Sequence, residues 1–257
     1  MKTRFYLLFF FFSFCQVSLS AQFAENIRSG RPGQGIGAYT LGAKVFQLQS
    51  GVNYNSIDFD TNNGTDRWLH NTVVRLGLVE KWEVSAVFNW RTDEFTMNQD
   101  EERQFGISNT QIGARYNVVS GKEKGPTLGI QARALLRAQS EAYRREKIGV
   151  TAIAMSSQSL SDKWGLLLNV GMTWTGNNTD PRSFYALSLN GSLSQKWSTF
   201  VEVYGNIENP TANYDAGFAF LVNPDFQLDI SAGWQGDEAV QDWFVDGGIS
   251  WRIVWRE

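Results

Sequence analysis

Residue types that carry enzymatic chemistry are scarce in this sequence of 257 residues. Nucleophilic and general-base catalysis needs a histidine or a thiolate held beside a partner group. The chain has one histidine, His70, and one cysteine, Cys15. Alternation with Trp68, Thr72 and Val74 puts His70 on an apolar face, which favours an interfacial residue over a general base. Metal-ligand spacings, phosphate loops and nucleophile elbows are also missing, so an enzyme is the least favoured class and no cofactor is expected.

Charged residues instead fall on the polar face of segments that alternate between polar and apolar residues. Arginines come from the first half of the chain and carboxylates from the second. The predicted inner-wall set is Arg75, Arg91, Arg115, Arg133, Arg137, Glu202, Asp215, Asp229 and Asp246. If the segments are strands of a closed barrel, these two groups face each other across the lumen and set up a transverse field that orients dipolar solutes. The alternative is that the charges pair with one another and fill the lumen as a structural network.

The segments that would position these charges show a period of two over about ten residues. The clearest runs from Trp164 to Trp174, where every second residue is apolar and Asn169 and Thr173 lie on the opposite face. Residues 82–90, 226–234 and 243–255 repeat the pattern. An extended segment of this length spans roughly 33 Å, which a tilt of about 40° reduces to about 25 Å, the height of the apolar band of a membrane barrel.

The apolar faces begin and end in aromatic side chains, as is typical of the two membrane–water interfaces of a barrel. The predicted girdle is Trp82, Trp90, Trp164, Trp174, Trp197, Phe226, Trp234, Trp243, Trp251 and Trp255. Strands open repeatedly with similar triplets: Glu80-Lys81-Trp82, Asp162-Lys163-Trp164 and Gln195-Lys196-Trp197. In each, the lysine would lie in an aqueous turn and the tryptophan at the interface.

Short turns alternate with longer polar loops along the chain. The longer loops are predicted at Asn55–Arg67, Thr92–Gln104, Ala138–Glu146, Thr175–Arg182, Asn206–Ala212 and Gln235–Gln241. This arrangement predicts an all-β fold, a transmembrane antiparallel up-and-down β-barrel of about twelve strands with short periplasmic turns and longer extracellular loops. Counts of ten or fourteen strands stay open, because either face of residues 148–160 could be the lipid side. The barrel is predicted over residues 43–257.

The first residues predict secretion to the outer membrane of a Gram-negative cell. Lys2 and Arg4 precede the apolar run Phe5–Phe14, and cleavage after Ser20 or Ala21 is expected, with residues 1–21 as the signal peptide. Cys15 lies within that signal, so the mature chain has no cysteine. Residues 22–42 form an N-terminal periplasmic or lumen segment. Its glycine-rich part, residues 30–42, is predicted to be a flexible lead-in that could enter the lumen as a plug.

Several short motifs occur in a characteristic order. They are Arg31-Pro32-Gly33, Arg75-Leu76-Gly77-Leu78, Gly106-Ile107-Ser108-Asn109, Gly113-Ala114-Arg115-Tyr116, Asn169-Val170-Gly171, Phe200 to Gly205, Asp215-Ala216-Gly217 and Gln227 to Gly233. In this order the chain resembles the outer-membrane barrel family labelled MetA-pathway of phenol degradation, whose members are often called transporters. The resemblance covers nearly the whole mature chain and implies a barrel with a transport role. Gln49 departs from it, because an acidic residue is expected on the inner face of strand one.

These observations predict a channel or transporter for small, aromatic or apolar solutes, with passive passage through the charged lumen or sideways through the wall. Its partners would be outer-membrane lipid, the solute and the barrel assembly machinery during insertion. A net charge of −3 gives no basic surface for nucleic acid. The alternative is a closed structural or surface-interaction barrel, in which a loop carrying Asp100, Glu101 and Glu102 binds something outside.

Overall fold

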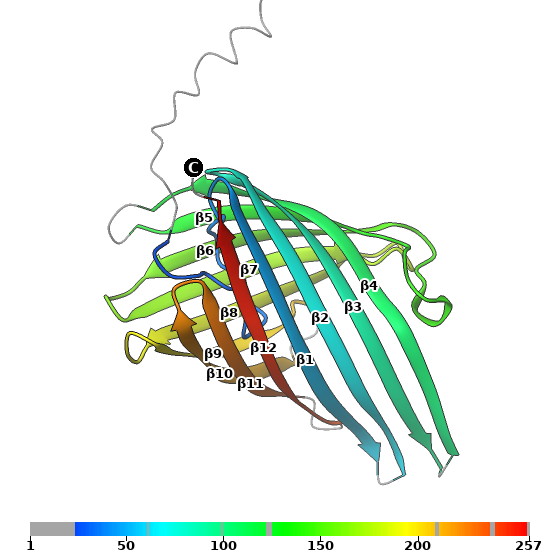
Figure 1. Cartoon of the computed structure of the whole chain (residues 1–257). Helices are drawn as coiled ribbons and strands as arrows, with labels where there is room; N and C mark the ends of the chain where they lie inside the picture. The colour runs from blue at the N-terminus through cyan, green and yellow to red at the C-terminus, as the bar shows by residue number, and fades with distance from the viewer. Residues whose placement is uncertain are drawn as a thin grey trace, which may run out of the picture.

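A computed structural model describes residues 24–60, 62–98, 100–121, 125–208, 211–236 and 240–255. The predicted signal peptide and Cys15 lie outside these residues. Within them the chain forms one closed barrel of twelve antiparallel strands (Figure 1). The prediction of about twelve strands is therefore confirmed. No helix in the described ranges is long and apolar enough to cross a membrane.

Each strand pairs with its neighbours in the sequence, and β1 closes the ring against β12, from Val45 opposite Val254 to Asp58 opposite Gln241. The strands are β1 (Val45–Asp60), β2 (Asn63–Val79), β3 (Trp82–Met97), β4 (Asp100–Val119), β5 (Thr127–Leu135), β6 (Gly149–Ser159), β7 (Trp164–Trp174), β8 (Arg182–Ser192), β9 (Trp197–Asn206), β10 (Ala212–Asn223), β11 (Phe226–Gln235) and β12 (Gln241–Val254). One 3-10 helix, η1 (Glu141–Tyr143), lies between β5 and β6. Closure leaves no strand edge exposed to lipid, which a wall inside a bilayer requires.

Two of the predicted loops are strands. The expected loops Asn55–Arg67 and Thr92–Gln104 are wrong, because β1 and β2 are paired as far as Asp60 and Asn63, and β3 and β4 as far as Met97 and Asp100. Figure 1 shows these hairpins reaching beyond the neighbouring strands. Most of their outward side chains are polar, with Phe105 as an exposed exception, and Tyr54 Oη donates to Asp66 Oδ1 at 2.6 Å between β1 and β2. Polar and apolar residues alternate only where one face of a strand contacts lipid. The sequence pattern therefore does not predict the parts of these strands that extend beyond the membrane.

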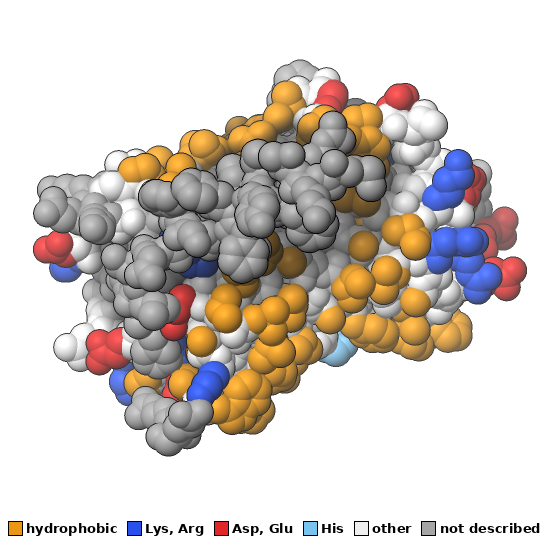
Figure 2. All heavy atoms as spheres, turned by 90° about the horizontal axis from the view of Figure 1, so that it is seen from above, with side chains coloured by type: hydrophobic (Ala, Val, Ile, Leu, Met, Phe, Trp, Pro, Cys, Tyr) orange, Lys and Arg blue, Asp and Glu red, His pale blue; other side chains and the backbone are white. Residues whose placement is uncertain are grey.

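The outer wall is apolar and flanked by aromatic rings at both ends of the strands. All predicted girdle tryptophans are exposed on this wall, and Phe226 is half-buried there. Neighbouring strands add rings that are not in the predicted girdle: Tyr116 lies 4.7 Å from Trp82, and Tyr54 lies 4.8 Å from Trp68, measured between ring centroids. Figure 2 shows hydrophobic side chains spread over the wall, with charged ones gathered toward its ends.

A substitution at Ile230 can test which part of the outer wall contacts the hydrocarbon of the bilayer. Ile230 is 56% exposed and lies midway along β11, between Phe226 and Trp234. We expect Ile230→Arg to lower the free energy of unfolding by about 2–4 kcal/mol, the cost of an arginine on the lipid face at the bilayer midplane. Denaturant titration of the barrel in lipid vesicles would measure it. Asn178→Arg, in the exposed loop after β7, is the control and should change stability by less than about 0.5 kcal/mol; equal effects would place the membrane elsewhere.

Candidate functional site

The N-terminal segment, residues 24–44, lies inside the barrel. Its backbone bonds to inner-wall side chains from widely separated strands: Ala38 N donates to Ser157 Oγ at 3.0 Å, and Ile36 N to Asn169 Oδ1 at 2.7 Å. Asn169 also donates to Ile36 O at 2.9 Å. Figure 1 shows the segment passing within the ring of strands. The expectation of a flexible lead-in therefore differs from the structure, where an irregular segment is hydrogen-bonded across the lumen.

Arg31 carries the main electrostatic contact of this segment. Its Nη2 lies 3.0 Å from Asp229 Oδ1 and also pairs with Asp246, while Nε donates to Asp229 at 3.1 Å. Gly51 and Gly248 face the guanidinium, and a Cβ on either would overlap it. The N-terminal segment thus supplies the counter-charge for the acidic wall. The sequence pattern does not predict this role for Arg31, although Arg31-Pro32-Gly33 is one of the motifs that carry the family resemblance.

The other two acidic wall residues lie directly opposite each other. Glu202 on β9 is the register partner of Asp215 on β10. Like charges facing each other across strands are destabilising. The backbone N–H groups of Gln34 and Gly35 donate to Glu202 at 2.7 and 2.9 Å, so the same segment supplies hydrogen bonds to one member of this pair.

The basic wall has its own carboxylate. Glu83 on β3 is 1% exposed and accepts from Arg75 Nη2 at 2.7 Å, and Arg115 Nε lies 3.6 Å from it. Arg115 also donates to Gln131 at 2.8 Å and to Gly37 O and Tyr39 O at 3.1 Å. The hypothesis of two opposed walls therefore needs revision, because each wall is partly neutralised within itself or by the N-terminal segment.

A third cluster lies at the outer rim. Asp93 is fully buried between Arg67 Nε at 2.7 Å and Arg91 Nε at 2.6 Å. Tyr143 of η1 donates to Asp93 at 3.0 Å, and burial together with that carboxylate raises the pKa of Tyr143 to about 12. The loop that carries η1 is thereby fastened to the rim.

The structure places most of the predicted inner-wall residues on the interior face. Arg75, Arg115, Glu202, Asp215 and Asp229 are buried, and Arg91, Arg133 and Asp246 are half-buried. Arg137 differs: β5 ends at Leu135, and Arg137 is exposed in the following loop, where its Nε donates to Arg145 O. Gln49, where an acidic residue was expected, is buried and donates to Ser29 Oγ at 2.7 Å.

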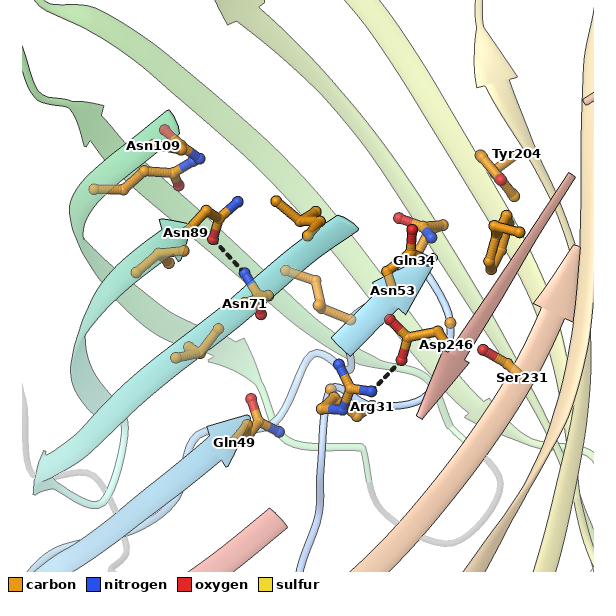
Figure 3. Close-up of a pocket in the computed structure, with 18 of the residues that line it drawn as sticks. Arg31, Gln34, Gln49, Asn53, Asn71, Asn89, Asn109, Tyr204, Ser231 and Asp246 are labelled. Carbon is orange, nitrogen blue, oxygen red and sulfur yellow. Dashed lines mark hydrogen bonds and ion pairs between the residues drawn. The ribbon is translucent and has the colours of Figure 1, made fainter. Parts of the chain in front are cut away.

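The N-terminal segment separates two hollows in the lumen. The outer cavity, of about 560 Å³, is lined on the long-loop side by β1–β5, by β9, β11 and β12, and by Arg31 (Figure 3). The inner cavity, of about 550 Å³, is lined by the same segment and by β6–β11, with Lys163 at the short-turn end. Gly30 and Arg31 border both. The lumen is therefore hollow on either side of one irregular segment.

His70 lies on the outer wall, away from both cavities. It is exposed, and its Nε2 lies 2.9 Å from Ser50 Oγ, with Val52 and Trp90 as its cross-strand neighbours. The hydrogen bond satisfies two polar groups on an otherwise apolar surface.

Comparisons with known proteins agree with this architecture. A family model described as "Putative MetA-pathway of phenol degradation" matches residues 29–253. The COG4313 outer membrane channel from Pseudomonas putida F1 superposes with a TM-score of 0.68 at 10% identity, covering 88% of this chain and 100% of that one. The KdgM porin in complex with disordered oligogalacturonate gives 0.54 at 7% identity over 79% and 98%. The translocator domain of the autotransporter NalP from Neisseria meningitidis gives 0.53 at 11% over 87% and 90%. No curated protein sequence matches the chain.

Removing the Arg31 charge should loosen the N-terminal segment. Arg31→Gln leaves Asp229 and Asp246 without their cation, and losing one partner of a buried ion pair costs about 3–5 kcal/mol. We expect hydrogen exchange of the Gln34 and Gly35 amides, which bond to Glu202, to speed up by at least about tenfold, since 1.4 kcal/mol is a factor of ten. Arg103→Gln removes an exposed pair with Glu94 at 3.4 Å and should leave these amides unchanged. Equal exchange in both variants would show that Arg31 does not hold the segment.

Proposed function

The chain belongs to the MetA-pathway of phenol degradation family of outer-membrane barrels, and from that premise we propose that it is a channel for small solutes. Solutes would pass along the barrel axis through the charged lumen, and the N-terminal segment would control the path. The observation that carries this proposal is the pair of cavities, about 560 and 550 Å³, on either side of that segment. A barrel that served only as structure would fill this space with side chains.

Two of the similar solved structures support a channel, since one is named an outer membrane channel and another a porin. The third is the translocator domain of an autotransporter, so the fold alone does not decide the role. The side chains that line the lumen also support a channel. Polar and charged groups can form hydrogen bonds and ion pairs with a solute as it loses its hydration shell. In the outer cavity, Val73, Val87 and Phe244 can contact an apolar part of the same solute.

Passage along the axis is favoured over passage through the wall. A groove of about 610 Å³ on the outer surface is lined by Trp82, Tyr116 and small residues such as Ala132 and Ala152. The strands beneath it are paired without a gap, as Arg115 opposite Gln131 and Gln131 opposite Ile153 illustrate. A sideways route would have to break this ladder inside the bilayer, where unpaired backbone groups cost several kcal/mol each.

An enzymatic role has little support in this geometry. His70 faces outward, and its hydrogen-bond partner within the described part of the chain is the Ser50 hydroxyl. General-base catalysis would need a carboxylate or another group to orient it. We therefore propose transport without chemical conversion of the solute.

Single-channel recording in a planar bilayer would test the proposal. We expect the refolded chain from Gln22 onward to give small conductance steps, and a variant lacking Gln22–Gly42 to give steps several-fold larger, because its two cavities would join. Both proteins should show the same heat-dependent shift in gel mobility, which reports a folded barrel. A folded deletion variant without conductance would refute the channel and favour the closed structural or surface-interaction barrel.

A further inference from the structure

We propose that the outer cavity is a binding site for a small monocarboxylate with an apolar body and a hydrogen-bonding group at its far end, and that Arg133 anchors the carboxylate. This inference rests on the proposed function, since the ligand would be a solute on its way through the lumen. It names the solute class that the channel would admit.

Five arginines line the outer cavity: Arg31, Arg67, Arg75, Arg115 and Arg133. Most of them have a carboxylate within ion-pair distance. Arg31 pairs with Asp229 and Asp246, Arg67 with Asp93, and both Arg75 and Arg115 with Glu83. Among the residues that the structure describes, Arg133 has no carboxylate within 4.0 Å. This wall thus holds three arginines, Arg75, Arg115 and Arg133, and one carboxylate, Glu83, which leaves it with a net positive charge.

Arg133 is also short of hydrogen bonds. Its Nε is buried and has no partner within the described part of the chain. Its register partner on β4 is Gly113, and a Cβ there would lie 2.6 Å from Arg133 Cγ. The glycine leaves the space in which the arginine stem lies across the wall. A guanidinium nitrogen that is buried without a hydrogen-bond partner is costly, and a guanidinium matches the two oxygens of a carboxylate with two parallel hydrogen bonds.

The side chains around Arg133 are arranged in rows, because inward residues of paired strands lie level with one another. The cationic row holds Arg75, Ser85, Gly113 and Arg133, which are successive register partners on β2, β3, β4 and β5. The next row toward the outside holds Val73, Val87, Gln111 and Leu135. We call this the valine row, since Val73 and Val87 face each other and both line the cavity.

An amide row follows. Asn71 faces Asn89, and Asn89 faces Asn109. Asn71 Nδ2 donates to Asn89 Oδ1 at 2.6 Å, and Asn109 Oδ1 accepts from Arg145 at 2.7 Å. Figure 3 shows all three side chains directed toward the cavity. Each amide keeps donor or acceptor capacity beyond these bonds, so the row can bind a hydroxyl or a carbonyl.

The spacing of the rows sets the size of the ligand. Residues on one face of a strand repeat every ~6.7 Å, so the cationic and amide rows are about 13 Å apart along the strands. One aromatic ring bearing a carboxylate and a para hydroxyl, with a hydrogen bond of about 3 Å at each end, has this order of length. The valine row lies level with the ring of such a ligand. An inorganic anion would use Arg133 alone and gain nothing from the other two rows.

Calorimetric titration of the folded full barrel in a nonionic detergent tests the site, with 4-hydroxybenzoate as the probe. We expect Arg133→Gln to weaken its binding at least tenfold. Arg133→Lys should bind with intermediate affinity, because it keeps the charge and loses the planar fork. Arg137→Gln, two residues beyond the end of β5 and exposed, is the matched control and should bind as the parent does. Because Arg133 has no ion pair to lose, its variants should fold, which gel mobility checks.

Two further probes separate the parts of the proposal. The neutral 4-hydroxybenzamide should bind the parent and the Arg133→Gln variant equally weakly, and acetate should bind the parent at least tenfold more weakly than 4-hydroxybenzoate. Equal binding of 4-hydroxybenzoate to the parent and to Arg133→Gln, or no binding to the folded parent, would overturn the site. If 4-hydroxybenzoate binds the parent no more tightly than acetate does, the valine and amide rows do not contribute to binding. Titration in micelles needs no open pore, so a barrel that binds yet never conducts would refute the channel and leave the site standing.

Discussion

The ladder of backbone hydrogen bonds that closes on itself between β1 and β12 is the constraint on which the rest of this protein depends. Inside a bilayer, each unpaired N–H or C=O costs several kcal/mol, so the wall must be complete. A complete wall of strands has a strict period of two and therefore two faces. The outer face must be largely apolar to meet lipid, and the charged groups at membrane depth are thereby directed into the lumen.

That division creates an electrostatic problem, which the N-terminal segment resolves. Charges that share a confined lumen lose hydration and need partners. Arg31 compensates Asp229 and Asp246, while backbone N–H groups of Gln34 and Gly35 bond to Glu202. The same segment offers carbonyl oxygens to arginines, from Gly37 to Arg115 and from Ala24 to Arg252. The segment therefore acts as an electrostatic complement to both walls, and not only as an obstacle in the pore.

The sequence predicted the wall well and its interior less completely, for physical reasons. Lipid imposes the alternation, so Trp164–Trp174 and the strand count could be recognised without a structure. Beyond the apolar band that constraint ends, and the polar extensions of β1–β4 looked like loops. Arg137 was assigned to the inner wall because alternation was counted past Leu135, where β5 ends. The contacts of Arg31 were out of reach, since an irregular segment has no periodicity and its partners are about two hundred residues away.

Most of the arginines that line the outer cavity are paired with a carboxylate, so the unpaired one stands out. A pore needs solute binding that is favourable enough for entry and weak enough for release. A wall of unpaired arginines would bind an anionic solute too tightly to release it. A fully neutralised wall would not attract the anion into the lumen. Glu83 compensates two neighbouring arginines and leaves Arg133 as the cation without a carboxylate among the described residues that line the outer cavity. One available guanidinium, beside an apolar row and an amide row, meets both conditions: it attracts a carboxylate with a single strong contact and relies on weak contacts for the remainder of the solute.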